Sequence, residues 1–128
     1  MTHYHYPSLQ PLRVPGGWNV SHNSWYQLDP DSESDRGFLT EDLLQLHHER
    51  CNLLVDVGWY GDWSNVLTGE WPAGVFRSVV YRGDFHGILL ADFRSQSQLE
   101  VVVVVEGWLL QPAFFRDPEP SSEDDSDP

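Results

Sequence analysis

The strongest constraint on the fold is a pair of short apolar segments joined by a tight turn. Residues 42–48 alternate leucines with polar side chains, a period of two that is typical of a half-buried strand. Residues 49–52 supply turn-forming side chains, and residues 53–60 return as the most apolar strand of the chain. This pattern predicts a β-hairpin. A short helix over residues 41–47 is the competing interpretation of its first arm.

Three further segments have the composition of strands. Residues 18–28 are rich in bulky side chains, and we expect a strand with a bulge near Asn23. Residues 75–82 and 88–94 are apolar segments separated by a glycine-containing turn. With the hairpin, these segments predict an antiparallel sheet of about five strands.

The last apolar segment supports two interpretations. The five consecutive valines of residues 101–105 favour a strand, because β-branched side chains lose rotamer freedom in a helix. Ser97 and Glu100, in contrast, have the spacing of a helix capping box, and Pro112 ends a helix. We interpret residues 98–110 as a helix. Its expected apolar face is Leu99, Val102, Val103, Glu106, Leu109 and Leu110.

These elements predict an α+β fold in which one C-terminal helix packs on a face of the sheet. A chain of 128 residues has the length of one domain. We expect an irregular arm over residues 1–16, a single domain over residues 17–111 and a disordered acidic tail over residues 112–128.

The charge of the chain is strongly unbalanced. Twenty Asp and Glu residues face seven Lys and Arg residues, all of them Arg, for a net charge of -13. Such a chain repels phosphate, which excludes nucleic acid and an anionic membrane surface as partners. The single cysteine, Cys51, forms no intramolecular disulfide, and the N-terminus lacks the pattern of a signal peptide. We expect a cytoplasmic protein, a monomer or a weak dimer.

The motifs of common catalytic sites are missing from the sequence. It has no glycine-rich phosphate loop, no dinucleotide fingerprint and no nucleophile elbow. Cys51 next to His47 and His48 is better explained as structure than as a nucleophile. On a strand these two histidines point to opposite faces, so they do not ligate one metal ion together. His3 and His5 lie in the arm. We predict no enzyme activity, no cofactor and no metal.

One acid and one aromatic cluster carry the functional hypothesis. Asp56 alternates with valines in the most apolar strand, so it either faces solvent or is buried with a partner such as Arg77 or Arg82. The segment that follows it mixes tryptophans with acids, a composition that suits docking of a cationic protein. The competing interpretation is that Trp59 and Trp71 fill the core. The candidate partner-binding residues are Asp56, Trp59, Tyr60, Asp62, Trp63 and Glu70.

Several strand ends and turns also carry a resemblance. They are residues 17–20 (GWNV) with Asn23, 26–30 (YQLDP), 41–46 (EDLLQL), 55–60 (VDVGWY), 82–85 (RGDF) and 93–95 (FRS). Over about residues 15–111 the chain resembles small bacterial proteins similar to the immunity proteins encoded beside secreted polymorphic toxins. The run of valines departs from the more polar helix of that pattern. The resemblance implies a single-domain cytosolic inhibitor without catalysis, and it assigns no binding residue.

The sequence thus predicts an acidic, immunity- or antitoxin-like protein that neutralises a basic protein partner, such as a secreted toxin domain, by occlusion. A second hypothesis is a small-ligand-binding protein or enzyme with a tryptophan-lined pocket between sheet and helix.

Overall fold

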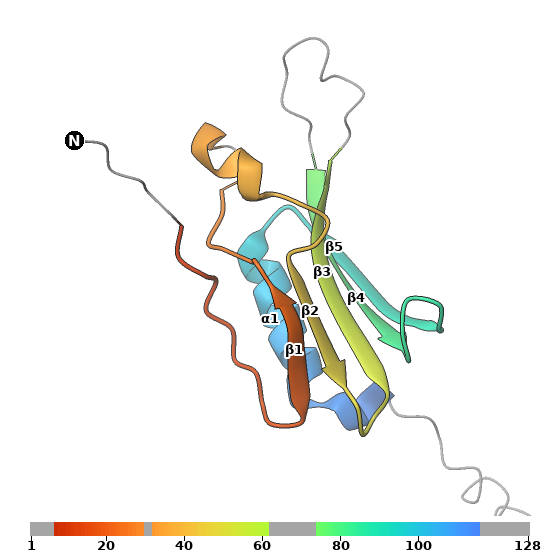
Figure 1. Cartoon of the computed structure of the whole chain (residues 1–128). Helices are drawn as coiled ribbons and strands as arrows, with labels where there is room; N and C mark the ends of the chain where they lie inside the picture. Colours follow the sequence, from red (N-terminus) through yellow and green to blue (C-terminus); the bar gives the residue numbers. More distant parts are fainter. Residues whose placement is uncertain (1–6, 30–31, 62–73, 116–128) are drawn as a thin grey trace, which may run out of the picture.

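The chain folds as an antiparallel sheet with one long helix on one of its faces (Figure 1). The computed structural model describes residues 7–29, 32–61 and 74–115. Its strands follow one another across the sheet in the order β1-β2-β3-β4-β5. The elements are β1 (Trp18–Asn23), η1 (Glu33–Phe38), β2 (Leu44–His48), β3 (Leu53–Gly61), β4 (Gly74–Arg82), β5 (Leu89–Ser95), α1 (Gln98–Leu110) and η3 (Pro112–Phe115). The predicted α+β fold is confirmed.

The predicted hairpin is formed by β2 and β3. The two strands pair antiparallel from Leu44 opposite Val57 to His48 opposite Leu53. Asn52 closes the turn with a φ of 55°, a left-handed conformation that asparagine tolerates better than most residues. The alternative helix over residues 41–47 is therefore wrong, because tertiary pairing and the period of two prevail over local helix propensity.

The first strand is shorter than residues 18–28. β1 ends at Asn23, and the bulge expected near Asn23 lies between Val20 and His22. Beyond the strand, Trp25 is buried in the core and Tyr26 forms an isolated antiparallel bridge with Leu9. The bulky side chains after Asn23 therefore mark core contacts of a loop and do not continue the strand.

The alternation of side chains along β3 gives the two faces of the sheet different compositions. Side chains on one face form a single buried cluster with the inner side of α1. From β3 this cluster takes Leu53, Val55, Val57 and Trp59. Asp56 points the other way, because successive side chains of a strand alternate between faces. No helix within the described ranges lies on that second face, which we call the open face (Figure 1).

Helix α1 begins and ends where the sequence predicts. The Ser97 hydroxyl accepts a hydrogen bond from the Glu100 backbone N–H at 3.2 Å. The reciprocal half of the capping box is replaced by Ser95, whose hydroxyl donates to the Glu100 carboxylate and accepts from the Ser97 backbone N–H. Pro112 then follows directly after the C-cap residue, Gln111.

The buried face of α1 differs from the expected one. The helix buries Val101, Val102, Val105 and Leu109. Leu99, Val103 and Leu110, which were expected to face the sheet, are 71%, 70% and 65% exposed. Because nine of the thirteen residues of the helix are apolar and lie on several sides of it, periodicity along the sequence does not indicate which face turns inward.

The N-terminal arm runs along the β1 side of the sheet and is bonded to α1 (Figure 1). Gln98 donates to the Gln10 side-chain oxygen at 2.8 Å, and Glu106 accepts from the Arg13 backbone N–H at 2.8 Å. The indole N–H of Trp18 donates to the Leu109 carbonyl at 2.9 Å. At the other end, η3 continues the packed structure past residue 111, and Phe115 lies against the core cluster.

No helix in the described part of the chain has the length and apolar composition needed to cross a membrane.

Candidate functional site

A small cavity on the open face collects the least ordinary polar groups of the molecule. His22, Asp42, Gln45 and Asp56 line a volume of about 200 Å³. We call it the acidic pocket. Asp56 is only 7% exposed and forms its floor, whereas Asp42 and His22 lie exposed at its rim. Two carboxyl groups therefore share a cavity whose size suits a single ammonium or guanidinium group.

Backbone pairing places Asp42 next to Asp56. Gln45 pairs directly with Asp56 in the β2–β3 ladder, and the Leu43 backbone N–H donates to the Val57 carbonyl at 3.0 Å. One step further, the Trp59 N–H donates to the Thr40 carbonyl at 2.8 Å. Between these two bonds the chain crosses Gly58 so closely that a Cβ there would lie 2.2 Å from the Glu41 carbonyl oxygen. The absence of a side chain at Gly58 is what permits this crossing.

The environment of Asp56 favours its protonated form. Burial, followed by the nearby charge of Asp42, raises the pKa of Asp56 from 3.8 to about 6. Arg77, a hydrogen bond from Gln45 and His22 act in the opposite direction but do not cancel the rise. The carboxylate of Asp56 thus lacks full compensation by positive charge within the described part of the chain.

Arg77, one of the two cations expected to pair with Asp56, forms its ion pair with another carboxylate. Its guanidinium forms a two-pronged pair with Asp92, with N–O distances of 3.1 and 2.9 Å. This pair lowers the pKa of Asp92 and raises that of Arg77. Arg77 also lies 6.0 Å from the centre of the Tyr60 ring. Arg82, the other expected partner of Asp56, instead donates to the Phe115 carbonyl at 3.0 Å.

The rim of the pocket is held by hydrogen bonds between β1 and the start of β2. Nε2 of His22 donates to the Asp42 backbone carbonyl at 2.9 Å, and the Ser24 hydroxyl donates to the same carbonyl at 3.0 Å. The Ser21 hydroxyl donates to the Gln45 side-chain oxygen at 2.9 Å. That bond leaves the Gln45 amide nitrogen to donate to Asp56. The Asp42 backbone and the Gln45 side chain are therefore held by hydrogen bonds within the fold.

The structure brings together only part of the predicted binding set. Asp56 and Tyr60 lie on the open face, and burial followed by the Asp56 charge raises the pKa of Tyr60. Trp59 does not join them: it is 2% exposed and belongs to the core on the helix side. The expectation that Trp59 presents a docking surface is wrong, because residues 56 and 59 have opposite parity on one strand. Asp62, Trp63 and Glu70, like Trp71, lie outside the described residues.

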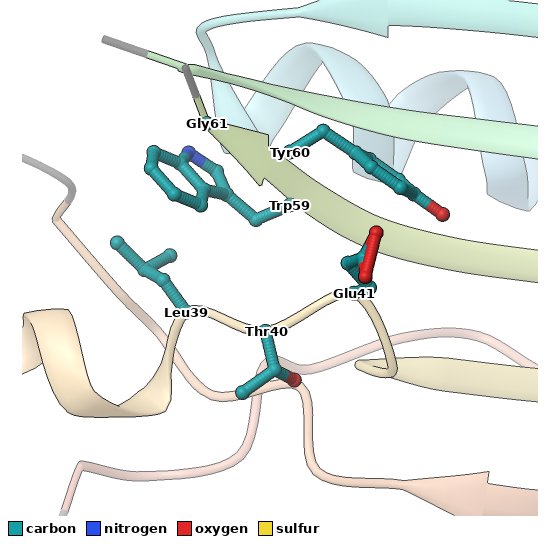
Figure 2. Close-up of a pocket in the computed structure, with 6 residues that line it drawn as sticks. All are labelled: Leu39, Thr40, Glu41, Trp59, Tyr60 and Gly61. Atoms are coloured by element: carbon teal, nitrogen blue, oxygen red, sulfur yellow. The ribbon is translucent and has the colours of Figure 1, made fainter. Parts of the chain in front are cut away.

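A second cavity, of about 370 Å³, opens at the end of β3. Figure 2 shows Leu39 on the side of the Trp59 ring and Glu41 on the side of the Tyr60 ring. Glu41 contributes to the raised pKa of Tyr60. This pocket thus adjoins the open face through Tyr60, but its indole wall is the edge of the core.

The histidines and the cysteine have structural surroundings. His48 is buried against Trp18, and its Nδ1 accepts from the Cys51 backbone N–H at 3.0 Å. His47 is half-buried on the opposite face, as the alternation predicts. His3 and His5 are not among the described residues. Within the described ranges, no three His, Cys, Asp or Glu side chains converge as metal ligands do.

Sequence reasoning missed three residues of the acidic pocket: His22, Asp42 and Gln45. Gln45 could have been predicted, because it is one of the polar residues that alternate with leucines in the first arm of the hairpin. That arm pairs with the strand that carries Asp56. His22 and Asp42 come together through the β1–β2 pairing and the bulge in β1. No local sequence pattern predicts this arrangement.

Comparisons with protein families, with curated proteins and with solved structures found no match to this chain.

Proposed function

We propose that this protein binds a basic protein partner and occludes it, with the acidic pocket receiving an Arg or Lys side chain of that partner. The observation that carries the proposal is Asp56, a nearly buried carboxyl beside a second carboxyl and without full internal compensation. The negative charge of Asp42, which adds to the proton affinity of Asp56, also attracts an external cation to the pocket.

The surroundings of the pocket support a protein partner. Tyr60 offers a half-buried ring next to Asp56, and tyrosine combines apolar contact area with a polar tip at interfaces. The net charge of -13 attracts a basic protein over a distance of about 8 Å at physiological salt and increases the association rate. A secreted toxin domain is the partner class that the resemblance to immunity proteins implies.

Capture from a lysate of the source organism at low salt tests the proposal. The immobilised chain should retain a basic protein, and the Asp42→Asn/Asp56→Asn variant should lose it. Glu49→Gln/Asp84→Asn removes the same charge from two turns outside the pocket and should retain the partner. Equal capture by both variants would show that overall charge, and not the acidic pocket, is responsible.

The proposal also requires a pH dependence. Asp56 is ionised above pH 6 and protonated below it, so the affinity for the basic partner should fall as the pH drops from 7 to 5. In Asp56→Asn this fall should be much smaller. An equal fall in affinity for both proteins would mean that a group other than Asp56 causes the pH dependence.

A small-ligand carrier is the second candidate, favoured by the cavity between Leu39, Trp59 and Tyr60. A ligand bound there stabilises the folded state in proportion to its concentration. A thermal-shift screen separates the candidates: a saturable shift, lost in Leu39→Trp, supports the carrier, and a screen without shifts leaves the protein-binding proposal favoured.

A further inference from the structure

The outer side of α1 is an apolar surface that the fold does not use. Leu99, Val103 and Leu110 are each at least 65% exposed and lie along one stripe of the helix. Gly107 lies on the same side, and together the four residues form what we call the outer strip. A surface helix normally carries charged and polar side chains on the side turned away from the core, whereas this stripe is apolar. The outer strip therefore lacks a cover within the described part of the chain.

Gly107 is not explained by the packing of the chain itself. A Cβ at this position would meet nothing within 4 Å, and glycine inside a helix costs about 1 kcal/mol relative to alanine. Gly107 also lines a cavity of about 420 Å³ toward β5, together with Trp108 and Phe114. Phe114 is 79% exposed at its mouth. The strip and this groove form one continuous apolar surface, with the glycine at the point where another backbone can approach.

The charges around the outer strip define its occupant. On a helix of 3.6 residues per turn, Glu106 and Glu100 lie at its two edges, about 120° apart. The last turn of α1 contains no basic residue to balance the negative end of the helix dipole, and no Lys or Arg occurs between Arg94 and Arg116. An apolar ridge flanked by cations complements this surface, because the ridge covers its apolar side chains and the cations meet its negative charges.

The C-terminal segment of the same protein fits this surface poorly. Residues 117–128 contain six acids and no large apolar side chain, so they offer nothing to bury on the strip. A second copy would bring an equally apolar helix, but it has no cation between residues 95 and 115 to meet Glu100 and Glu106. Two chains of charge -13 also repel one another.

We propose that the outer strip of α1 and the adjoining groove bind a basic amphipathic helix of another protein. The helix lays its apolar ridge over Val103 and Gly107, and its cations flank the ridge beside Glu100 and Glu106. This surface lies on the opposite side of the sheet from the acidic pocket. The inference is therefore independent of the proposed function.

A labelled model helix of leucine and lysine, with the leucines on one face, provides the probe for the full-length chain. Fluorescence anisotropy should show saturable binding. A control helix with the same leucine ridge but flanked by glutamates should bind at least ~10-fold more weakly. Val103→Ser/Leu110→Ser should weaken binding of the lysine probe by ~10-fold, because it removes the apolar anchors. Gly107→Leu, which replaces glycine with a better helix former, should weaken it similarly by blocking close approach.

Matched controls separate this site from general attraction to an acidic protein. Phe85→Ser/Ile88→Ser removes two exposed apolar side chains from the β4–β5 turn and should leave the affinity unchanged. Glu49→Gln/Asp84→Asn, which removes two negative charges from turns outside both surfaces, should also leave it unchanged. Equal affinity of the strip variants and the wild-type chain overturns the proposal. A dimer in sedimentation that Val103→Ser/Leu110→Ser abolishes also overturns it, since the strip would then be covered by a second copy.

Discussion

The two sides of β3 differ in the side chains that they present. Toward α1 it presents Val55, Val57 and Trp59, all buried in the core cluster. Toward the open face it presents Asp56 and Tyr60, whose pKa values are both raised by burial. Apolar burial stabilises the first side, whereas the second holds a carboxyl in surroundings that oppose its charge. One strand therefore combines a stabilising apolar side with a carboxyl group whose burial lowers the stability of the free protein.

The largest effect is expected on the covered side. Phe76→Ala removes a fully buried ring opposite Trp59 and should cost about 3–5 kcal/mol of unfolding free energy. Tyr81→Ala, on the half-buried open face, should cost only about 1–2 kcal/mol. Urea denaturation of both variants measures the contrast. Equal losses would mean that the two faces contribute alike to the core.

A substitution of Asp56 should increase the free energy of unfolding instead of decreasing it. The folded-state pKa of about 6 lies above the unfolded value of 3.8, so the wild-type protein loses stability as the pH rises from about 4 to 6. Asp56→Asn avoids this loss and should be more stable by about 2 kcal/mol at pH 8, a value reduced for the solvent that reaches the pocket. At pH 4 the difference should nearly vanish. Denaturation at both pH values checks it, and a destabilised variant at pH 8 would contradict the account.

The Arg77–Asp92 pair should matter less, because both side chains are about one-quarter exposed. Asp92→Asn should cost about 0.5–1 kcal/mol near neutral pH. The pKa of Asp92 is lowered by Arg77, so this contribution is present above the unfolded pKa and disappears as the pH falls through the lower folded value. A pH series of melting temperatures for variant and wild type measures it. A loss that persists in strong acid would point to packing and not to charge.

The smallest effect is expected on the outer side of the helix. Leu99→Gln should change the unfolding free energy by less than about 0.5 kcal/mol, because the side chain is already in water. Val101→Ala, two residues away and fully buried, should cost about 2 kcal/mol. If both variants lose stability equally, α1 packs with a face other than the one described here.

Much of the fold was predictable because its signals are local. The period of two identified β2, and the apolar segment after the turn identified β3. A serine cap and a proline set the limits of α1 at residues 98 and 110. The inward face of α1 was not predictable, since Leu99 and Val103 are as apolar as Val101 and Val105. Only the placement of the sheet decides between them.

The candidate site was partly predictable from the same alternation. Asp56 and Tyr60 are four residues apart and share a face, whereas Trp59 must lie on the other, so strand parity alone excludes Trp59 from their surface. The rest of the acidic pocket depends on strand order. His22 and Asp42 are brought to Asp56 by the neighbouring positions of β1, β2 and β3, which a single sequence does not encode locally.

The most direct test of the cation-binding role of the acidic pocket is an NMR titration of the Asp56 carboxyl carbon, alone and with a short arginine-rich peptide at low salt. We expect a pKa of about 6 for the free protein and a lower pKa when a guanidinium group occupies the pocket. A pKa that stays the same when the peptide is added would contradict it.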